Sequence, residues 1–125
     1  MRTHESGEDY LETILLLYRK QGYVRSTDIA NAMNYTKASI SRAVKILKED
    51  GYIYLDQNKM IFLTEKGNQK ALQIYERHEV ITQFLEKVLL VDADTAEHDA
   101  CHMEHVISDA TLQGLKRLLD EHQAK

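Results

Sequence analysis

Side chains that bind metal ions are concentrated between residues 98 and 105. These eight residues include three histidines, one cysteine and two acidic residues. Cys101, Glu104 and His105 are spaced i, i+3 and i+4, so a single helix would place all three on one face. A thiolate, a carboxylate and an imidazole on one face indicate a site for a divalent transition metal.

Two further groups of donors lie far from this segment. Asp9 and Glu12 are three residues apart, so both carboxylates leave the same face of a helix. His78 lies in the middle of a long stretch with helical periodicity. Donors from three helices could therefore meet around one ion. Oxygen and nitrogen ligands suit Mn²⁺ or Fe²⁺, whereas an added sulfur favours Fe²⁺, Co²⁺, Ni²⁺ or Zn²⁺.

Each of these features also has a simpler interpretation. Two acids in a first helical turn often just interact with the helix dipole, and a lone cysteine is often a small buried hydrophobe. His98 and His102, four residues apart, could form a zinc-type pair of their own. The sequence has no His-Glu-x-x-His motif, glycine-rich loop or nucleophile motif. We therefore expect neither an enzyme nor a small-molecule substrate.

The segment 36–50 has the composition of a DNA-reading helix. It carries four basic residues, and its two acidic residues lie at the far end. Lys and Arg can contact guanine or phosphate, and small hydroxyls near the N-terminus allow a close approach. A solvated amphipathic face is the simpler alternative. The expected DNA-binding residues are Ser26, Thr36, Lys37, Ser39, Ser41, Arg42, Lys45 and, in a hairpin tip, Lys59.

Apolar periodicity, caps and glycines predict the elements that position these residues. Helices are expected at 7–20, 27–33 and 37–50, strands at 52–55 and 60–63, and helices at 65–89, 93–107 and 109–122. The expected N-caps are Ser26, Thr36, Thr64, Asp92 or Asp94, and Ser108. This order predicts a mostly α fold with a small β wing: a winged helix-turn-helix over 1–64, followed by a helical metal-binding and dimerisation region over 65–125.

The composition indicates the cellular compartment and the kinds of partner to expect. The chain has 125 residues, a net charge of −4 and a single cysteine, so a disulfide framework is excluded. No run of 18 apolar residues and no secretory leader are present, so we expect a cytoplasmic protein without a membrane partner. The acidic balance does not exclude DNA binding, which needs a basic patch rather than a basic protein.

With these residues placed, the sequence resembles the diphtheria-toxin-repressor and manganese-transport-regulator family over nearly its whole length. The resemblance is carried by five segments: Glu8-Asp9-Tyr10-Leu11-Glu12, Ser26-Thr27-Asp28-Ile29-Ala30, Leu63-Thr64-Glu65-Lys66-Gly67, Arg77-His78-Glu79 and, most specifically, the run from Asp99 to Ser108. The resemblance is to the short form of the family, which lacks a C-terminal SH3-like domain.

The resemblance implies a metal-activated repressor of metal-uptake genes that binds a palindromic operator as a homodimer. It places metal ligands at Asp9, Glu12, His78, Cys101, Glu104 and His105. Asp9 is similar to the manganese-sensing branch, where the iron-sensing branch has methionine. Cys101 is similar to the iron-sensing branch, where the manganese branch has glutamate. The expected activator is therefore Mn²⁺ or Fe²⁺, and the sequence does not choose between them.

The dimer contact and the rival functions follow from the same pattern. We expect dimerisation through the leucine-rich face of 109–122 and the apolar positions of 84–91. Two half-sites read by a dimer would strengthen the weak binding of one module. The alternative is a winged-helix regulator that responds to Zn²⁺, Ni²⁺, Co²⁺, a small molecule or oxidation of Cys101.

Overall fold

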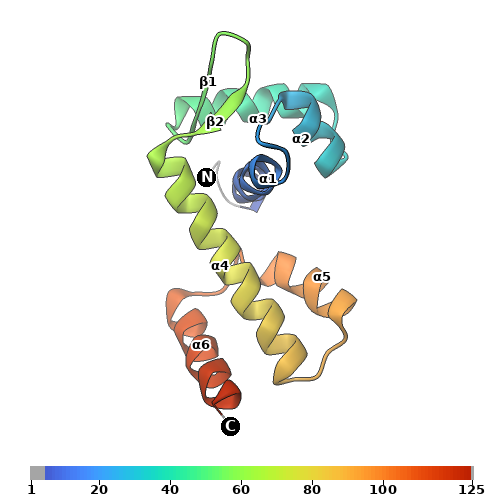
Figure 1. Cartoon of the computed structure of the whole chain (residues 1–125), viewed down its shortest axis with the longest axis vertical. Helices are drawn as coiled ribbons and strands as arrows, with labels where there is room; N and C mark the ends of the chain where they lie inside the picture. Colours follow the sequence, from blue (N-terminus) through green and yellow to red (C-terminus); the bar gives the residue numbers. More distant parts are fainter. Residues whose placement is uncertain (1–4, 125) are drawn as a thin grey trace. The chain divides into compact units, whose positions relative to one another are not determined.

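The structure is a computed structural model, and it describes residues 5–124 of the chain. The elements of this part follow in the order α1 (Glu5–Gln21), α2 (Ser26–Met33), α3 (Lys37–Glu49), β1 (Ile53–Leu55), β2 (Ile61–Leu63), α4 (Glu65–Lys87), α5 (Ala93–Met103) and α6 (Asp109–Gln123) (Figure 1). The chain divides into two compact units, the first ending at Leu72 and the second beginning at Gln73. The predicted fold class, a mostly helical chain with one small hairpin, is confirmed.

The first unit is a helix-turn-helix followed by a hairpin. Helix α2 ends at Asn34, whose left-handed backbone (φ 57°) is one that asparagine tolerates better than most residues. The N–H of Tyr35 donates to the carbonyl of Ala30 at 3.1 Å, and Thr36 then caps α3. The core of this unit is mainly aliphatic and draws on all of its helices and both strands: Tyr10, Leu11, Ile14, Leu15, Val24, Ile29, Ile40, Leu47, Ile53, Ile61 and Ala71.

Strands β1 and β2 form the wing. They pair antiparallel with Ile53 opposite Leu63, and Figure 1 shows their connection as a loop extending beyond α3. The carboxylate of Asp56 accepts two backbone N–H groups within this loop, which closes the turn. The N–H of Ile61 donates to the carbonyl of Val24 at 2.8 Å and so ties the wing to the segment between α1 and α2.

The first turns of α4 pack on the helix-turn-helix. The hydroxyl of Thr64 accepts the N–H of Gly67 at 3.0 Å and donates to the carbonyl of Gly51 at 2.6 Å. A Cβ on Gly67 would lie 1.9 Å from the carbonyl oxygen of Tyr52, so only glycine fits. These contacts explain why the compact units separate at Leu72, inside α4, whereas the sequence pattern put the boundary before this helix.

The second unit consists of the rest of α4 with α5 and α6. Figure 1 shows α5 and α6 on opposite sides of this part of α4. Its core is formed by Ile81, Leu85, Ala96 and Ala100, with half-buried apolar side chains packed against them. The guanidinium of Arg77 donates to the carbonyl of Ile107 at 2.7 Å and to that of Glu104 at 3.3 Å, and it pairs with Asp109. One arginine therefore holds the connection between α5 and α6.

Two local predictions were wrong. Ser26 is the first residue of α2 rather than its N-cap, because the cap position is taken by Arg25, whose N–H donates to the carboxylate of Asp28. The helix expected over 93–107 ends at Met103. The caps at Thr36, Thr64, Asp92 and Ser108 are confirmed, since each side chain accepts a backbone N–H three residues later.

Candidate metal centre and DNA-binding face

His78 is the centre of the donor cluster in the second unit. It lies on α4, and only 12% of its side chain is exposed. Its Nδ1 lies 2.7 Å from Oε1 of Glu104, and its Nε2 lies 3.0 Å from Oε2 of Glu97. The hydrogen bond to Glu104 raises the pKa of His78 to about 9 against the opposing effect of burial, and Glu97 raises it further. Without a metal, the imidazole is therefore protonated near neutral pH and its positive charge offsets two carboxylates.

Glu104 is the buried acid of this cluster. Its side chain is 1% exposed, and its Oε2 has no hydrogen-bond partner among the described residues. That oxygen lies 3.7 Å from Nε2 of His105, whose side chain is also 1% exposed. A buried carboxylate oxygen without a hydrogen bond is costly. Its burial beside two imidazoles fits coordination of a divalent cation, because a cation would satisfy that oxygen.

Glu97 and Cys101 provide further donors near the His78 ring. Both lie on α5, four residues apart, and therefore on one face of that helix. His78, Glu97 and Cys101 each have one possible donor atom that lies within 4.8 Å of the donor atoms of the other two residues. Glu97 was not among the residues predicted to bind metal. Its i, i+4 spacing to Cys101 was the available signal, but the same spacing is common on solvated helices.

The predicted single helical face is only partly present. Cys101 lies in the last turn of α5, whereas Glu104 and His105 follow in the short turn after Met103. The reason is that Ser108 caps α6 only five residues after α5 ends, so the chain must turn there. The structure nevertheless brings His78 and Glu104 into contact, with His105 beside Glu104 and Cys101 near His78.

Asp9 and Glu12, the two other predicted ligands, lie on α1 in the first unit. Both side chains are half-buried, and their spacing puts them on one side of the helix. Leu11 and Ile14 of the same helix are almost fully buried in the core of that unit. It stays a prediction that Asp9 and Glu12 bind the same metal ion as the donors of the second unit.

His98 and His102 form a separate pair on the exposed surface of α5. Their ring centroids are 5.0 Å apart in an edge-to-face arrangement, and Nδ1 of His98 lies 3.7 Å from a carboxylate oxygen of Asp99. Of the described residues, no group of three close donors includes either histidine. The two rings therefore lack a third ligand from their own surroundings.

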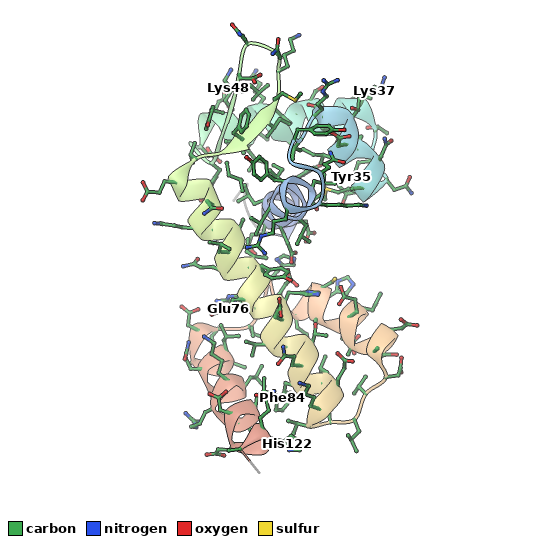
Figure 2. All side chains as sticks on the ribbon, in the orientation of Figure 1. Tyr35, Lys37, Lys48, Glu76, Phe84 and His122 are labelled. Atoms are coloured by element: carbon green, nitrogen blue, oxygen red, sulfur yellow. The ribbon has the colours of Figure 1, made fainter. Side chains whose placement is uncertain are left out.

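Helix α3 presents the predicted DNA-binding residues. Lys37, Ser41 and Lys45 recur every fourth residue and are exposed, so they share a face. Figure 2 labels Lys37 and Lys48 near opposite ends of α3, which shows that basic side chains occur along its length. Arg42 is also exposed.

The remaining predicted contacts lie at the ends of the motif. The hydroxyls of Thr36 and Ser39 are 3.0 Å apart, and Thr36 also accepts the N–H of Ser39, so both serve the helix cap. Ser26 is half-buried in the first turn of α2. Lys59 is exposed in the loop of the wing, with a left-handed backbone (φ 64°). Sequence reasoning overlooked Tyr35, an exposed aromatic residue directly before the cap of α3.

Known proteins match both units. Residues 2–60 match the family described as the N-terminal DNA-binding domain of iron-dependent repressors. Residues 64–124 match its metal-binding and dimerisation domain. The chain belongs to the iron-dependent repressor family. The resemblance identified from the sequence is thereby confirmed, and the protein is a metal-dependent, DNA-binding transcriptional regulator with a dimerisation domain.

Individual relatives agree with this assignment. An uncharacterised helix-turn-helix transcriptional regulator of Methanocaldococcus jannaschii is 34% identical over 122 residues, covering 97% of this chain and 98% of that protein. The helix-turn-helix transcriptional regulator MntR of Bacillus subtilis is 34% identical over 106 residues, covering 85% and 74%. The structure of the manganese regulator SloR superposes with a TM-score of 0.81 at 30% identity, covering 90% of this chain but 53% of SloR. This chain thus spans about half the length of that solved structure.

Two expectations from the sequence concern catalysis and membrane-spanning helices. The family consists of transcriptional regulators rather than enzymes. Within residues 5–124, no helix combines the length and the apolar composition that crossing a membrane requires.

Proposed function

We propose that this protein is a repressor of metal-uptake genes that binds a palindromic operator as a homodimer when Mn²⁺ or Fe²⁺ occupies its metal site. It acts in the cytoplasm, without a catalytic activity or a small-molecule substrate. The observation that carries the proposal is the buried, unsatisfied oxygen of Glu104 beside His78 and His105. It lies in the part of the chain that matches the metal-binding domain of the family.

The proposed ligands come from both units. The set comprises Asp9, Glu12, His78, Cys101, Glu104 and His105, and the geometry of α5 adds Glu97. A bound divalent ion supplies positive charge to Glu97 and Glu104, which the protonated imidazole of His78 provides in the absence of metal. His78 must lose its proton to act as a ligand, because only the neutral imidazole has a free electron pair. One ring nitrogen would then bind the ion, and the other would keep its proton and donate it to Glu104 or Glu97.

The first helix connects this chemistry to DNA. Without a metal, the acidic side chains of α1 and Glu104 repel one another if they approach. With a metal they attract, and α1 is held by Asp9 and Glu12. Since Leu11 and Ile14 bury α1 in the core beside α2 and α3, a constraint on α1 is a constraint on the DNA-reading helix. A coupling of ~1–3 kcal/mol would change DNA affinity roughly 5- to 150-fold.

The proposed DNA-binding face has side chains that read bases and basic side chains that contact phosphate. The first turns of α3 approach base edges, and its basic side chains contact phosphate. The proposed contacts are Ser26, Thr36, Lys37, Ser39, Ser41, Arg42, Lys45 and Lys59. The support for this assignment is the exposed row of basic and hydroxyl side chains on α3.

The proposed dimer contact lies on exposed apolar residues of the second unit. Leu89 and Leu90 are 55% and 82% exposed in the α4–α5 connection, and Leu118 of α6 is 46% exposed. Leu90 also has a left-handed backbone (φ 60°), which is unfavourable for leucine. This conformation closes the C-terminus of α4, where the N–H of Val91 donates to the carbonyl of Leu85 at 2.8 Å. The support for a partner surface is therefore the exposure of these leucines.

The donor set leaves the choice between the two metals to experiment. Carboxylate and imidazole ligands suit Mn²⁺, and relatives such as SloR are described as manganese regulators. The thiolate of Cys101 suits Fe²⁺ better. A Cys101→Glu variant, which removes sulfur and adds an oxygen donor, should therefore shift the preference toward Mn²⁺.

A DNA-binding titration tests the proposed function. Fluorescence anisotropy on the upstream region of a candidate uptake gene, at fixed salt, is measured first with chelator and then with Mn²⁺, anaerobic Fe²⁺, Co²⁺ and Zn²⁺. Glu104→Gln removes the buried charge at almost constant volume and should abolish the metal response. Glu79→Gln, next to His78 on the same helix, is the matched control and should retain it. Equal DNA binding with and without metal in the wild type would refute the proposal.

A further inference from the structure

Two tyrosines connect the metal-binding side of α1 to the start of the DNA-reading helix. Tyr10 follows Asp9 directly in α1, and Tyr35 directly precedes Thr36, the N-cap of α3. Their ring centroids are 5.9 Å apart with planes at 66°, an edge-to-face contact. Both residues lie in the first unit.

The two rings differ in their surroundings. Tyr10 is 7% exposed and is fixed in the core, whereas Tyr35 is 45% exposed. Burial raises the pKa of the Tyr10 hydroxyl, the nearby Tyr35 raises it further, and Arg42 of α3 lowers it. The hydroxyl of Tyr10 therefore lies near both the turn before α3 and a basic residue proposed to contact DNA.

The backbone of Tyr35 is tied to the motif. Its N–H donates to the carbonyl of Ala30 in α2, and the left-handed Asn34 fixes the direction of the preceding peptide. The Tyr35 side chain then has Tyr10 as its aromatic contact. A displacement of the Tyr10 ring would therefore act first on Tyr35, which directly precedes the N-cap of α3.

Tyr10 also lines a hollow in the first unit. A hollow of about 250 Å³ lies between α1 and α3, and Tyr10, Arg42, Ile46 and Leu47 line it. Packed cores resist small displacements, whereas a hollow allows a side chain to move.

We infer that the Tyr10–Tyr35 ring contact is the positioning element that transmits metal occupancy at Asp9 to the first turn of α3. The inference rests on the proposed function, because it requires that Asp9 binds the metal. Neither tyrosine is a metal ligand. The pair determines how strongly DNA affinity responds to the metal, and not how strongly the metal binds in the absence of DNA.

The test measures the enhancement factor, defined as the DNA dissociation constant in chelator divided by that in saturating Mn²⁺. Tyr10→Leu and Tyr35→Leu should each lower this factor by about 2- to 12-fold, the range expected for loss of one aromatic pair. The double variant should lose no more than either single variant, because both remove the same contact. Tyr10→Phe keeps the ring edge and should keep the factor. Mn²⁺ affinity without DNA, measured by calorimetry, should stay at the wild-type value in all of them.

The chain offers a matched control. Tyr18, on the same helix, makes an edge-to-face contact with Phe62 of the wing (6.5 Å, 65°). Tyr18→Leu removes a contact of the same type from the same unit, and the enhancement factor should not change. If Tyr10→Leu fails to fold, as judged by its melting curve, the exposed Tyr35→Leu variant carries the test.

Two outcomes would overturn the inference. The enhancement factor could survive in Tyr35→Leu, as it would if DNA affinity fell equally in chelator and in Mn²⁺ through loss of a merely structural or direct DNA contact. The losses of the two single variants could also be additive. These outcomes leave the proposed function intact if the wild type responds to metal and Glu104→Gln does not. A wild type without any metal response would instead overturn both proposals.

Discussion

The protonation of His78 gives the most direct test of the metal centre. In the metal-free protein its pKa is raised from 6.5 to about 9, and the hydrogen bond to the buried Glu104 is the largest cause. The difference corresponds to about 3 kcal/mol, at ~1.4 kcal/mol per pH unit. Glu97 contributes less, since its side chain is 60% exposed and water screens its charge.

The raised pKa of His78 determines in which direction fold stability and metal affinity change with pH. The folded pKa of His78 lies above its unfolded value, so the imidazolium stabilises the metal-free fold fully below pH 6.5. That stabilisation is lost as the pH rises through about 9. Metal binding runs in the opposite direction, because the proton must leave before the ring can bind metal. Apparent metal affinity should therefore rise with pH up to about 9 through His78.

The assay is an NMR titration of the His78 ring protons in metal-free protein. The wild type should titrate near pH 9. Glu104→Gln should lower the pKa of His78 most of the way toward 6.5, and Glu97→Gln should lower it less. Calorimetry in buffers of different ionisation enthalpy should show that Mn²⁺ releases a proton from the wild type at pH 7. A wild-type His78 that titrates near 6.5, or a larger effect of Glu97→Gln, would refute the reasoning.

Three further predictions concern packing, DNA contact and assembly. Gly67→Ala should destabilise the protein by ~1–3 kcal/mol in chemical denaturation, because its Cβ would lie 1.9 Å from the Tyr52 carbonyl oxygen. Gly114→Ala, with no atom closer than 3.9 Å, should instead stabilise it by up to ~1 kcal/mol. Lys45→Ala should weaken DNA binding and reduce the slope of log affinity against log salt by about 1, and an unchanged slope would argue against a phosphate contact. Leu90→Glu should raise the dimer dissociation constant in sedimentation equilibrium, and an unchanged dimer would place the interface elsewhere.

The local sequence determined most of the elements and the types of donor. Thr36 and Ser108 each cap a helix where their hydroxyls predicted it, because capping depends on residues within one turn. The order of helices and the hairpin indicated a winged helix-turn-helix for the same local reason. Cysteine, histidine and acidic residues at helical spacing indicated a metal site before any geometry was known.

Tertiary structure alone decided how these donors meet. Helical spacing placed Glu104 on the face of Cys101, and Glu104 keeps helical backbone angles as the C-cap of α5. Packing alone decided that its side chain is buried and that one of its oxygens has no hydrogen bond among the described residues. The role of Glu97 depends on α5 packing beside His78 of α4, a contact between residues 19 positions apart. The need for glycine at position 67 comes from a carbonyl that another part of the chain brings close. Local spacing determines which face a residue occupies, whereas long-range packing determines what that face meets.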